Sequence, residues 1–152
     1  MLRLAHRQEA SPPITTPLEQ VFDQHHGLVF RTAYRITGNA ADAEDVLQTV
    51  FLRLLGRKLD AAPMEQPESY LRRAAINASL DVLRQRRTGD SPVESSLPPT
   101  STNPELSHAL RQALATVAPR HAEMFILRYF EGYSNPEIAR MLGISSILVA
   151  VT

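Results

Sequence analysis

Apolar residues recur at intervals of three and four along most of the chain, the spacing of helices that bury one face. No segment alternates apolar and polar residues at every second position, as a half-buried strand would. The pattern therefore predicts an all-α fold. We expect helices over about residues 16–37, 39–56, 67–87, 104–117, 119–130, 134–142 and 146–152.

Capping residues mark where several of these helices begin. Thr16 and Glu19 have the spacing of a capping box, and Ser134 and Glu137 repeat it. Prolines occupy the expected first positions of four helices, where a missing backbone N–H costs little. The other predicted boundaries are Asn39, Asn103 and Ser145 as N-caps and Gly38 and Gly56 as helix ends.

Changes in composition divide the chain into four parts. Residues 1–15 are polar and proline-containing and predict a flexible tail. Residues 16–88 hold the first three helices, and residues 89–103 form a linker rich in Pro, Ser and Thr. Residues 104–152 hold a smaller helical domain that ends in a helix-turn-helix. The predicted architecture is two small helical domains joined by a flexible linker.

Two helix faces carry the candidate contact residues. On the second predicted helix, Asp45, Gln48 and Leu52 share a face, and Phe51 lies in the apolar stripe beside it. Such a face suits a basic, partly apolar partner helix. The alternative is an acidic helix start that simply suits the helix dipole.

The third predicted helix carries a polar stripe made of Arg73, Asn77, Asp81 and Arg84, followed by Arg86 and Arg87 at its end. Arginine pairs with phosphate and asparagine reaches base edges. Tyr70 near the helix start can stack on an exposed base, a contact worth roughly 1–3 kcal/mol. The alternative is a solvated basic helix end with Tyr70 in the core. The expected buried face is Tyr70, Leu71, Ala74, Ala78, Val82 and Leu83.

The balance of charges and the lack of cysteine narrow the function classes. Basic and acidic residues number 16 each, so any basic patch is local. Cysteine is absent, which removes disulfides and thiol chemistry. No apolar run has the length of a membrane span, and the N-terminus does not resemble a secretion signal. We therefore expect a cytoplasmic protein without a membrane partner.

Neither a metal site nor a catalytic site is indicated. Of the five histidines, only His25 and His26 are neighbours, and on a helix they point about 100° apart. No glycine-rich phosphate loop or nucleophile elbow is present. We expect no metal, no cofactor and no enzymatic activity.

Three stretches in this order resemble the extracytoplasmic-function (ECF) sigma factors, the small sigma-70-like proteins. They are DAEDVLQTVFLRLL, SYLRRAAINASLDVLRQRR and PRHAEMFILRYFEGYSNPEIARMLGIS. In this family they correspond to the helix that docks on RNA polymerase, the helix that melts and reads the promoter −10 element, and the start of region four, which reads the −35 element. The resemblance covers residues 18–152 and implies that residues 16–88 form region two and residues 104–152 region four.

The resemblance implies a transcription initiation factor whose partners are core RNA polymerase and promoter DNA, with an anti-sigma factor as a further candidate. It implies polymerase contacts through Asp45, Gln48, Phe51 and Leu52 and −10 contacts through the third helix. In the family, polymerase supplies the chemistry and the sigma factor supplies promoter selection and strand opening.

The C-terminal stretch departs from the family pattern. Ser145 and Ser146 fit the start of a recognition helix, but Ile147 and Leu148 replace a small residue and threonine, and Arg140 is the last charged residue. Region four is thus incomplete, and we expect weak −35 contacts through the two serines. The apolar residues either pack on the bundle or promote association.

Two alternatives to a working sigma factor remain open. One is a truncated, initiation-defective protein that binds polymerase or an anti-sigma partner. The other is a stand-alone helix-turn-helix regulator, which normally needs a dimerisation helix that the sequence does not show.

Overall fold

The computed structural model describes residues 16–57, 64–89 and 103–152. The predicted N-terminal tail and nearly all of the predicted linker lie outside these residues. Helices and their connections make up the described chain, which contains no strand, and the all-α prediction is confirmed. The helices are α1 (Pro17–Thr37), α2 (Ala40–Gly56), α3 (Pro67–Thr88), α4 (Pro104–Thr116), α5 (Pro119–Tyr129), α6 (Asn135–Leu142) and α7 (Ser146–Ala150).

Side-chain caps mark the starts of α1, α2, α4, α6 and α7 as the sequence predicts, whereas α3 and α5 begin at a proline without such a cap. Both capping boxes form, Thr16 with Glu19 and Ser134 with Glu137. Hydrogen bonds from the Ser134 backbone and hydroxyl lower the pKa of Glu137. Gly38 ends α1 in the left-handed region at φ 67°. The predicted stop at Gly56 is wrong by one residue, because α2 includes it and Arg57 is the cap.

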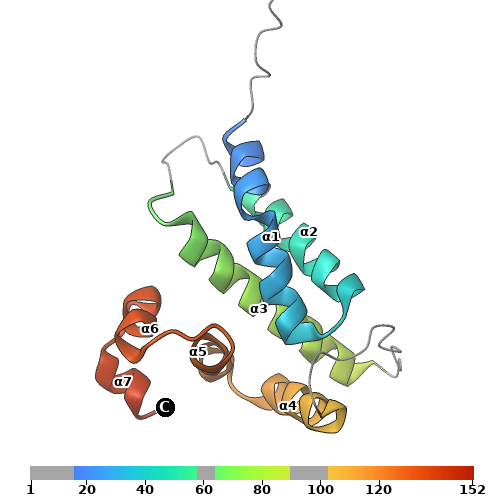
Figure 1. The fold of residues 1–152 in the computed structure, drawn as a ribbon, viewed down its shortest axis with the longest axis vertical. Coiled ribbons are helices and arrows are strands. Elements are labelled where there is room, and N and C mark those ends of the chain that lie inside the picture. Colours follow the sequence, from blue (N-terminus) through green and yellow to red (C-terminus); the bar gives the residue numbers. More distant parts are fainter. Residues whose placement is uncertain (1–15, 58–63, 90–102) are drawn as a thin grey trace, which may run out of the picture.

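Helices α1, α2 and α3 pack lengthwise against one another in the upper part of Figure 1. The side chains between them form one hydrophobic cluster, because each helix turns its apolar stripe inward. The cluster is built from Val29, Ala33, Ala43, Val46, Val50, Phe51, Leu54, Leu71, Ala75 and Ala78. Among the described helices, none is long and apolar enough to cross a membrane.

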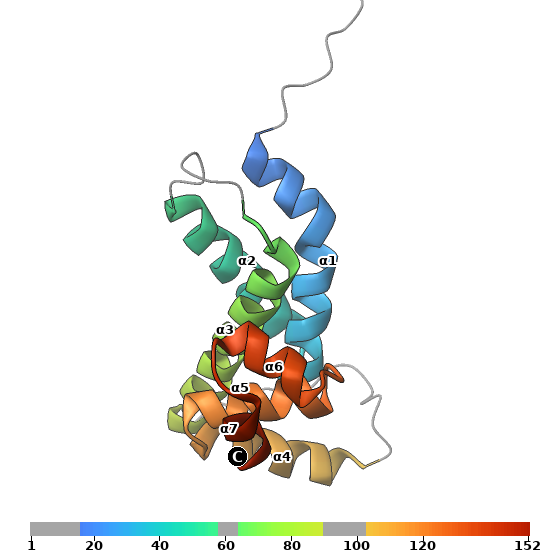
Figure 2. The same cartoon turned by 90° about the vertical axis from the view of Figure 1, so that its left-hand side faces the viewer.

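The second helical group, α4 to α7, packs directly on the first. Figure 2 shows α5 and α6 in front of α3, with α4 across its lower end. A second hydrophobic cluster joins α4–α7 to Ile36 of α1 and to Ile76, Leu80 and Leu83 of α3. Helix α3 is therefore buried on two sides. The sequence predicted one buried face; Ile76 and Leu80 were missed, while Tyr70, Ala74 and Val82 are only partly buried.

An arginine from α4 binds the turn between α1 and α2. Arg111 donates through Nε to the Ile36 carbonyl at 2.9 Å, and its guanidinium lies over Gly38. A Cβ at Gly38 would overlap this guanidinium, and the positive φ already disfavours a side chain.

We expect Gly38→Ala to destabilise the protein by about 1 kcal/mol or more. The added methyl group is strained at a positive φ, and it displaces the Arg111 guanidinium from its position over the turn. Urea unfolding measures the change. Gly56→Ala is the matched control: a methyl group at Gly56 would have no atom within 4 Å and no positive φ is found there, so stability should hold or rise. Equal changes in stability for Gly38→Ala and Gly56→Ala would contradict the role given to Gly38 in this turn.

Candidate nucleic-acid interface

Tyr70 lies in the first turn of α3, where the sequence predicts an aromatic contact with a base. Its ring is partly buried against the first hydrophobic cluster. The guanidinium of Arg57 lies 5.0 Å from the ring centroid, a cation–π distance. The ring is thus held in place from one side by packing and from another by a cation.

Arg73 and Asn77, the first two residues of the predicted stripe, face α5. Arg73 donates to Glu123 through Nε at 2.7 Å and to the Met141 carbonyl through Nη1 at 3.1 Å. Asn77 donates to the same Glu123 carboxylate at 3.3 Å. The two side chains that we expect to contact DNA are therefore bonded to the second helical group in this conformation.

The remaining residues of the predicted stripe lie towards the end of α3. Arg84 pairs with Asp81 at 3.4 Å, and Arg86 pairs with Asp42 of α2. Arg87 is exposed and has no hydrogen bond or ion pair within the described residues. Asp81 therefore lowers the local positive charge beside Arg84.

The predicted polymerase-docking face on α2 is exposed except at one position. Asp45, Gln48 and Leu52 all lie on the surface, Leu52 with 66% of its area exposed. Phe51 is instead buried, with its ring edge against Phe22 at a centroid distance of 4.9 Å. The assignment of Phe51 to a docking surface is thus corrected, because its side chain belongs to the core between α1 and α2.

Helices α6 and α7 form the predicted helix-turn-helix. Gly143 turns the chain at φ 65°, and the Ser145 hydroxyl caps α7 by accepting from the Leu148 N–H at 3.3 Å. Arg128 holds α7 in place by donating to the Val149 carbonyl at 3.1 Å and to Asn135. Val149 is buried, whereas Ile147 and Val151 are exposed, so only part of the apolar tail packs on the bundle.

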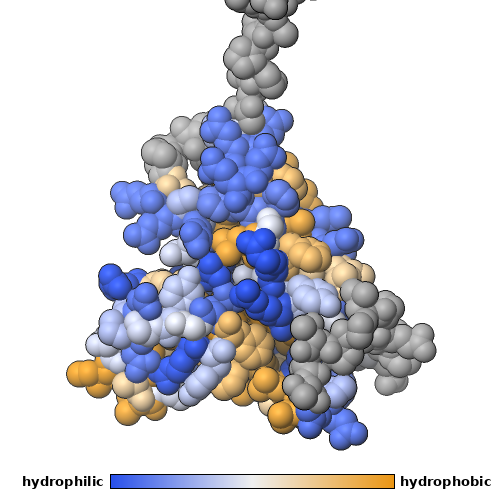
Figure 3. Space-filling model, in the orientation of Figure 1, coloured by the Kyte–Doolittle hydropathy of each residue, from blue (hydrophilic) through white to orange (hydrophobic). Residues whose placement is uncertain are grey.

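The surface of α7 is apolar where a recognition helix needs cations. Figure 3 shows hydrophobic surface at the lower left, over α7, below a mainly hydrophilic surface over α1. Helix α7 has five residues, none of them charged. Across the described chain, no group of three His, Asp or Glu residues is placed to hold a metal ion.

Comparison with known protein families accounts for both helical groups. Residues 21–88 match the Sigma-70 region 2 model, and residues 107–151 match the Sigma-70, region 4 model. The RNA polymerase sigma-E factor of Streptomyces avermitilis is 33% identical over 129 residues, which cover 82% of this chain and 72% of that protein. The chain belongs to the sigma-70-like RNA polymerase sigma factors.

Other relatives specify the ECF type. The ECF RNA polymerase sigma factor SigL of Mycobacterium tuberculosis is 31% identical, with 84% of this chain and 77% of that protein covered. The sigma factor CarQ of Myxococcus xanthus is 32% identical over 84% of this chain and 77% of its own length. This sigma factor therefore serves in transcription initiation, with α1–α3 in region two and α4–α7 in region four.

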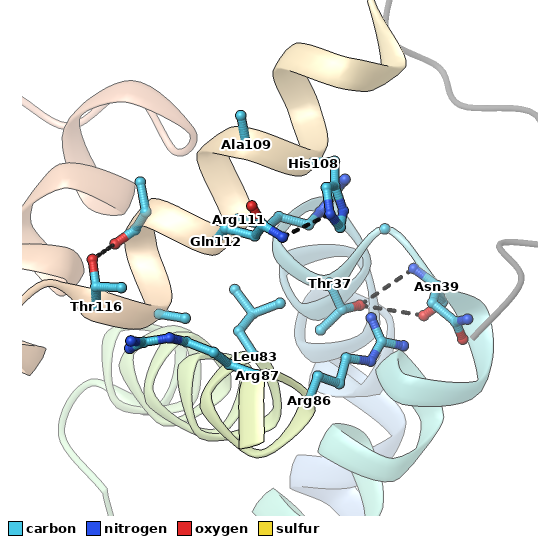
Figure 4. A pocket seen from close by; sticks show the side chains of 13 residues that line it. Thr37, Asn39, Leu83, Arg86, Arg87, His108, Ala109, Arg111, Gln112 and Thr116 are labelled. Carbon is cyan, nitrogen blue, oxygen red and sulfur yellow. Dashed lines mark hydrogen bonds between the residues drawn. The ribbon is translucent and has the colours of Figure 1, made fainter. Parts of the chain in front are cut away.

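A cationic cleft lies between region two and region four. Figure 4 shows Arg86 and Arg87 of α3 facing α4, which contributes His108 and Arg111. The cleft has a volume of about 930 Å³. Burial lowers the pKa of Arg86, and the nearby charge of Arg111 lowers it further; burial also lowers the pKa of Arg111. The seam between the two regions is therefore positively charged on both sides.

Sequence reasoning missed Arg72, which the structure places at the centre of the contact between the regions. It pairs with Glu68 at 2.9 Å and with Glu131, and its guanidinium lies 5.5 Å from the Tyr133 ring centroid. Burial acts to lower the pKa of Arg72, but Glu68, Tyr133 and Glu131 outweigh it and raise the pKa. Arg72 and Arg73 are neighbours in the sequence, and no local pattern distinguishes them. Only the position of region four gives them different partners, Glu131 for Arg72 and Glu123 for Arg73.

Proposed function

We propose that this sigma factor binds core RNA polymerase through α2 and directs promoter opening mainly at the −10 element through α3. The observation that carries the proposal is the arrangement of region two. Helix α2 exposes Asp45, Gln48 and Leu52, and the adjoining α3 carries Tyr70 at one end and an arginine-rich stripe along its length. A partner docked on α2 would bring promoter DNA close to α3.

The residues proposed for the −10 contacts are Tyr70, Arg73, Asn77, Asp81, Arg84, Arg86 and Arg87. Aromatic stacking on an unpaired base and arginine pairing with phosphate together suit a melted strand better than an intact duplex. We assign Asp81 a local role, as the partner of Arg84. The protein itself is proposed to be non-catalytic and to act in the cytoplasm, with polymerase forming the RNA.

The test is a pull-down with core RNA polymerase coupled to run-off transcription from a promoter with defined −10 and −35 elements. Retention of the sigma factor together with a specific transcript supports the proposal. Retention without a transcript instead supports the second candidate, an initiation-defective protein that binds polymerase or an anti-sigma partner. The lack of any charged residue in α7 is the observation that favours this second candidate.

We expect weak binding to −35 DNA because α7 offers no cation to neutralise the DNA phosphates. Phosphate neutralisation supplies most non-specific affinity for DNA. The candidate contacts are the hydroxyls of Ser145 and Ser146, and the Ser145 hydroxyl already caps α7. Fluorescence anisotropy with a labelled −35 duplex in about 50 mM salt measures this, with a scrambled duplex as control. Tight binding that distinguishes the two duplexes would contradict the expectation.

A further inference from the structure

The cationic cleft between region two and region four has the size of a small-molecule site. Its volume of about 930 Å³ lies within the range of about 300–1,000 Å³ that is typical of ligand pockets. Its walls come from α3, from α4 and from the turn between α1 and α2. Among the described residues that line it, none is aspartate or glutamate. The lining therefore offers cations, polar donors and apolar surface to a ligand, and no carboxylate that would repel an anion.

One end of the cleft holds two guanidinium groups. Figure 4 shows Arg86 directed towards Thr37 and Asn39, at the turn that Arg111 of α4 also binds. The charge of Arg111 lowers the pKa of Arg86, because two nearby cations repel each other. Asp42 pairs with Arg86, whereas Arg111 bonds a backbone carbonyl and has no carboxylate partner within the described residues. This end of the cleft therefore has one more cation than it has carboxylates.

Arg87 lies at the opposite end of the cleft. Its side chain points away from Arg86, towards the end at which Thr116 of α4 lies (Figure 4). Figure 4 also shows Leu83 of α3 between these two ends, and alanines of α4 complete the apolar part of the lining. The cleft thus has a cation at each end and an apolar middle.

Uncharged polar side chains beside the arginines can orient a ligand. His108 and Gln112 of α4 are exposed in the cleft, with their Nε2 atoms 2.9 Å apart. The side-chain oxygen of Asn39 accepts from the Asp42 N–H at 3.1 Å, which leaves its amide nitrogen as a donor. Amide and imidazole groups can bond phosphate oxygens or the polar edge of a base. Specific recognition beyond charge is therefore available on both walls.

We propose that the cationic cleft binds a small molecule with a phosphate group at each end and a ring system between them, such as a nucleoside phosphorylated on both its 3′ and 5′ oxygens. Arg86 and Arg111 take one phosphate and Arg87 takes the other, through charge-assisted hydrogen bonds. The sugar and base lie over Leu83. The site needs no contact with promoter DNA, so it stands apart from the proposed −10 function, although Arg86 and Arg87 belong to both.

The first measurement compares two ligands by isothermal titration calorimetry on the full-length chain. Adenosine 3′,5′-bisphosphate and adenosine 5′-diphosphate have the same number of phosphate groups, but only the former carries them at two separate positions. We expect the bisphosphate to bind roughly fivefold more tightly or better, because its second phosphate gains a charge-assisted hydrogen bond. Equal or tighter binding of the diphosphate would overturn the two-ended site, since charge alone would then explain the affinity. Failure of both compounds to bind would overturn it as well.

The second measurement removes the cation at one end of the cleft. Arg87→Gln should reduce the preference for the bisphosphate to about twofold or less, because only one phosphate then has an arginine partner. The matched control is Arg31→Gln, on α1, which removes an exposed cation that forms no ion pair within the described residues. Both arginines are exposed, so neither variant should unfold. A preference that both variants keep, or that both lose, would overturn the placement of a phosphate at Arg87.

The third measurement separates a free ligand from a DNA strand, which repeats the same unit of a nucleoside between two phosphates. His108 lines the cleft but is not among the residues proposed for DNA. His108→Ala should weaken bisphosphate binding roughly threefold or more, through loss of one hydrogen bond, and leave binding of a single-stranded −10 oligonucleotide to the polymerase complex unchanged. Equal losses for both would assign the cleft to DNA and overturn the free ligand. If the unmodified complex binds no oligonucleotide, the proposed −10 function fails, and the two titrations still decide the cleft.

Discussion

Replacing Leu52 by lysine is expected to weaken binding to core RNA polymerase at least tenfold, equivalent to about 1.4 kcal/mol or more. Leu52 is 66% exposed on α2 beside Gln48, and Asp45 lies two turns earlier on the same helix. The substitution removes apolar area from the proposed contact. It also places a cation opposite the partner surface, which we expect to be basic because the α2 face is acidic. Neighbouring Leu55, also exposed at 63%, extends this surface and was missed in the sequence.

Leu106→Lys provides the matched control for this change. Leu106 is also 66% exposed, but it lies on α4 of region four. Surface substitutions of this kind change stability by about 0.5 kcal/mol or less, so both variants should unfold like the unmodified protein. Biolayer interferometry with immobilised core polymerase gives the affinities. Equal losses for the two leucines, or none for either, would remove α2 as the docking helix.

Replacing Tyr70 by alanine is expected to lower the affinity of the polymerase complex for a single-stranded −10 oligonucleotide roughly 5- to 150-fold, the loss that corresponds to one base–aromatic stack of about 1–3 kcal/mol. The complex is the proper sample, because the free chain holds Arg73 and Asn77 against Glu123. Anisotropy of the labelled oligonucleotide measures the affinity. Tyr70→Phe keeps the ring and should retain most of it.

Two comparisons distinguish stacking from a structural role for Tyr70. Tyr129→Ala removes an aromatic side chain that is 65% exposed on α5 and is not among the residues proposed for DNA, and it should leave binding unchanged. Urea unfolding of Tyr70→Ala reports the packing lost from the first hydrophobic cluster. If Tyr70→Ala loses stability but binds the oligonucleotide normally, the ring is a core residue and its assignment to DNA is wrong.

Local signals in the sequence were enough to predict the helices and where they begin. Capping boxes such as Ser134 with Glu137 satisfy backbone groups within one turn, so their effect can be read without tertiary structure. The uncharged character of α7 was equally visible. The candidate contact residues could be grouped by helical spacing, but their exposure could not: Phe51 lies within the same turns as Gln48 and Leu52, yet it faces α1.

The sequence by itself determined an all-α chain, the starts of its helices, the family and the uncharged character of α7, because each depends on residues close together along the chain. Only the tertiary structure decided what faces α3. Helix α3 has one apolar stripe for region two, and Ile76 and Leu80 add a second side that is buried solely because region four packs there. The same contact brings Glu123 to Arg73 across 50 positions of sequence, a pairing that no local pattern encodes.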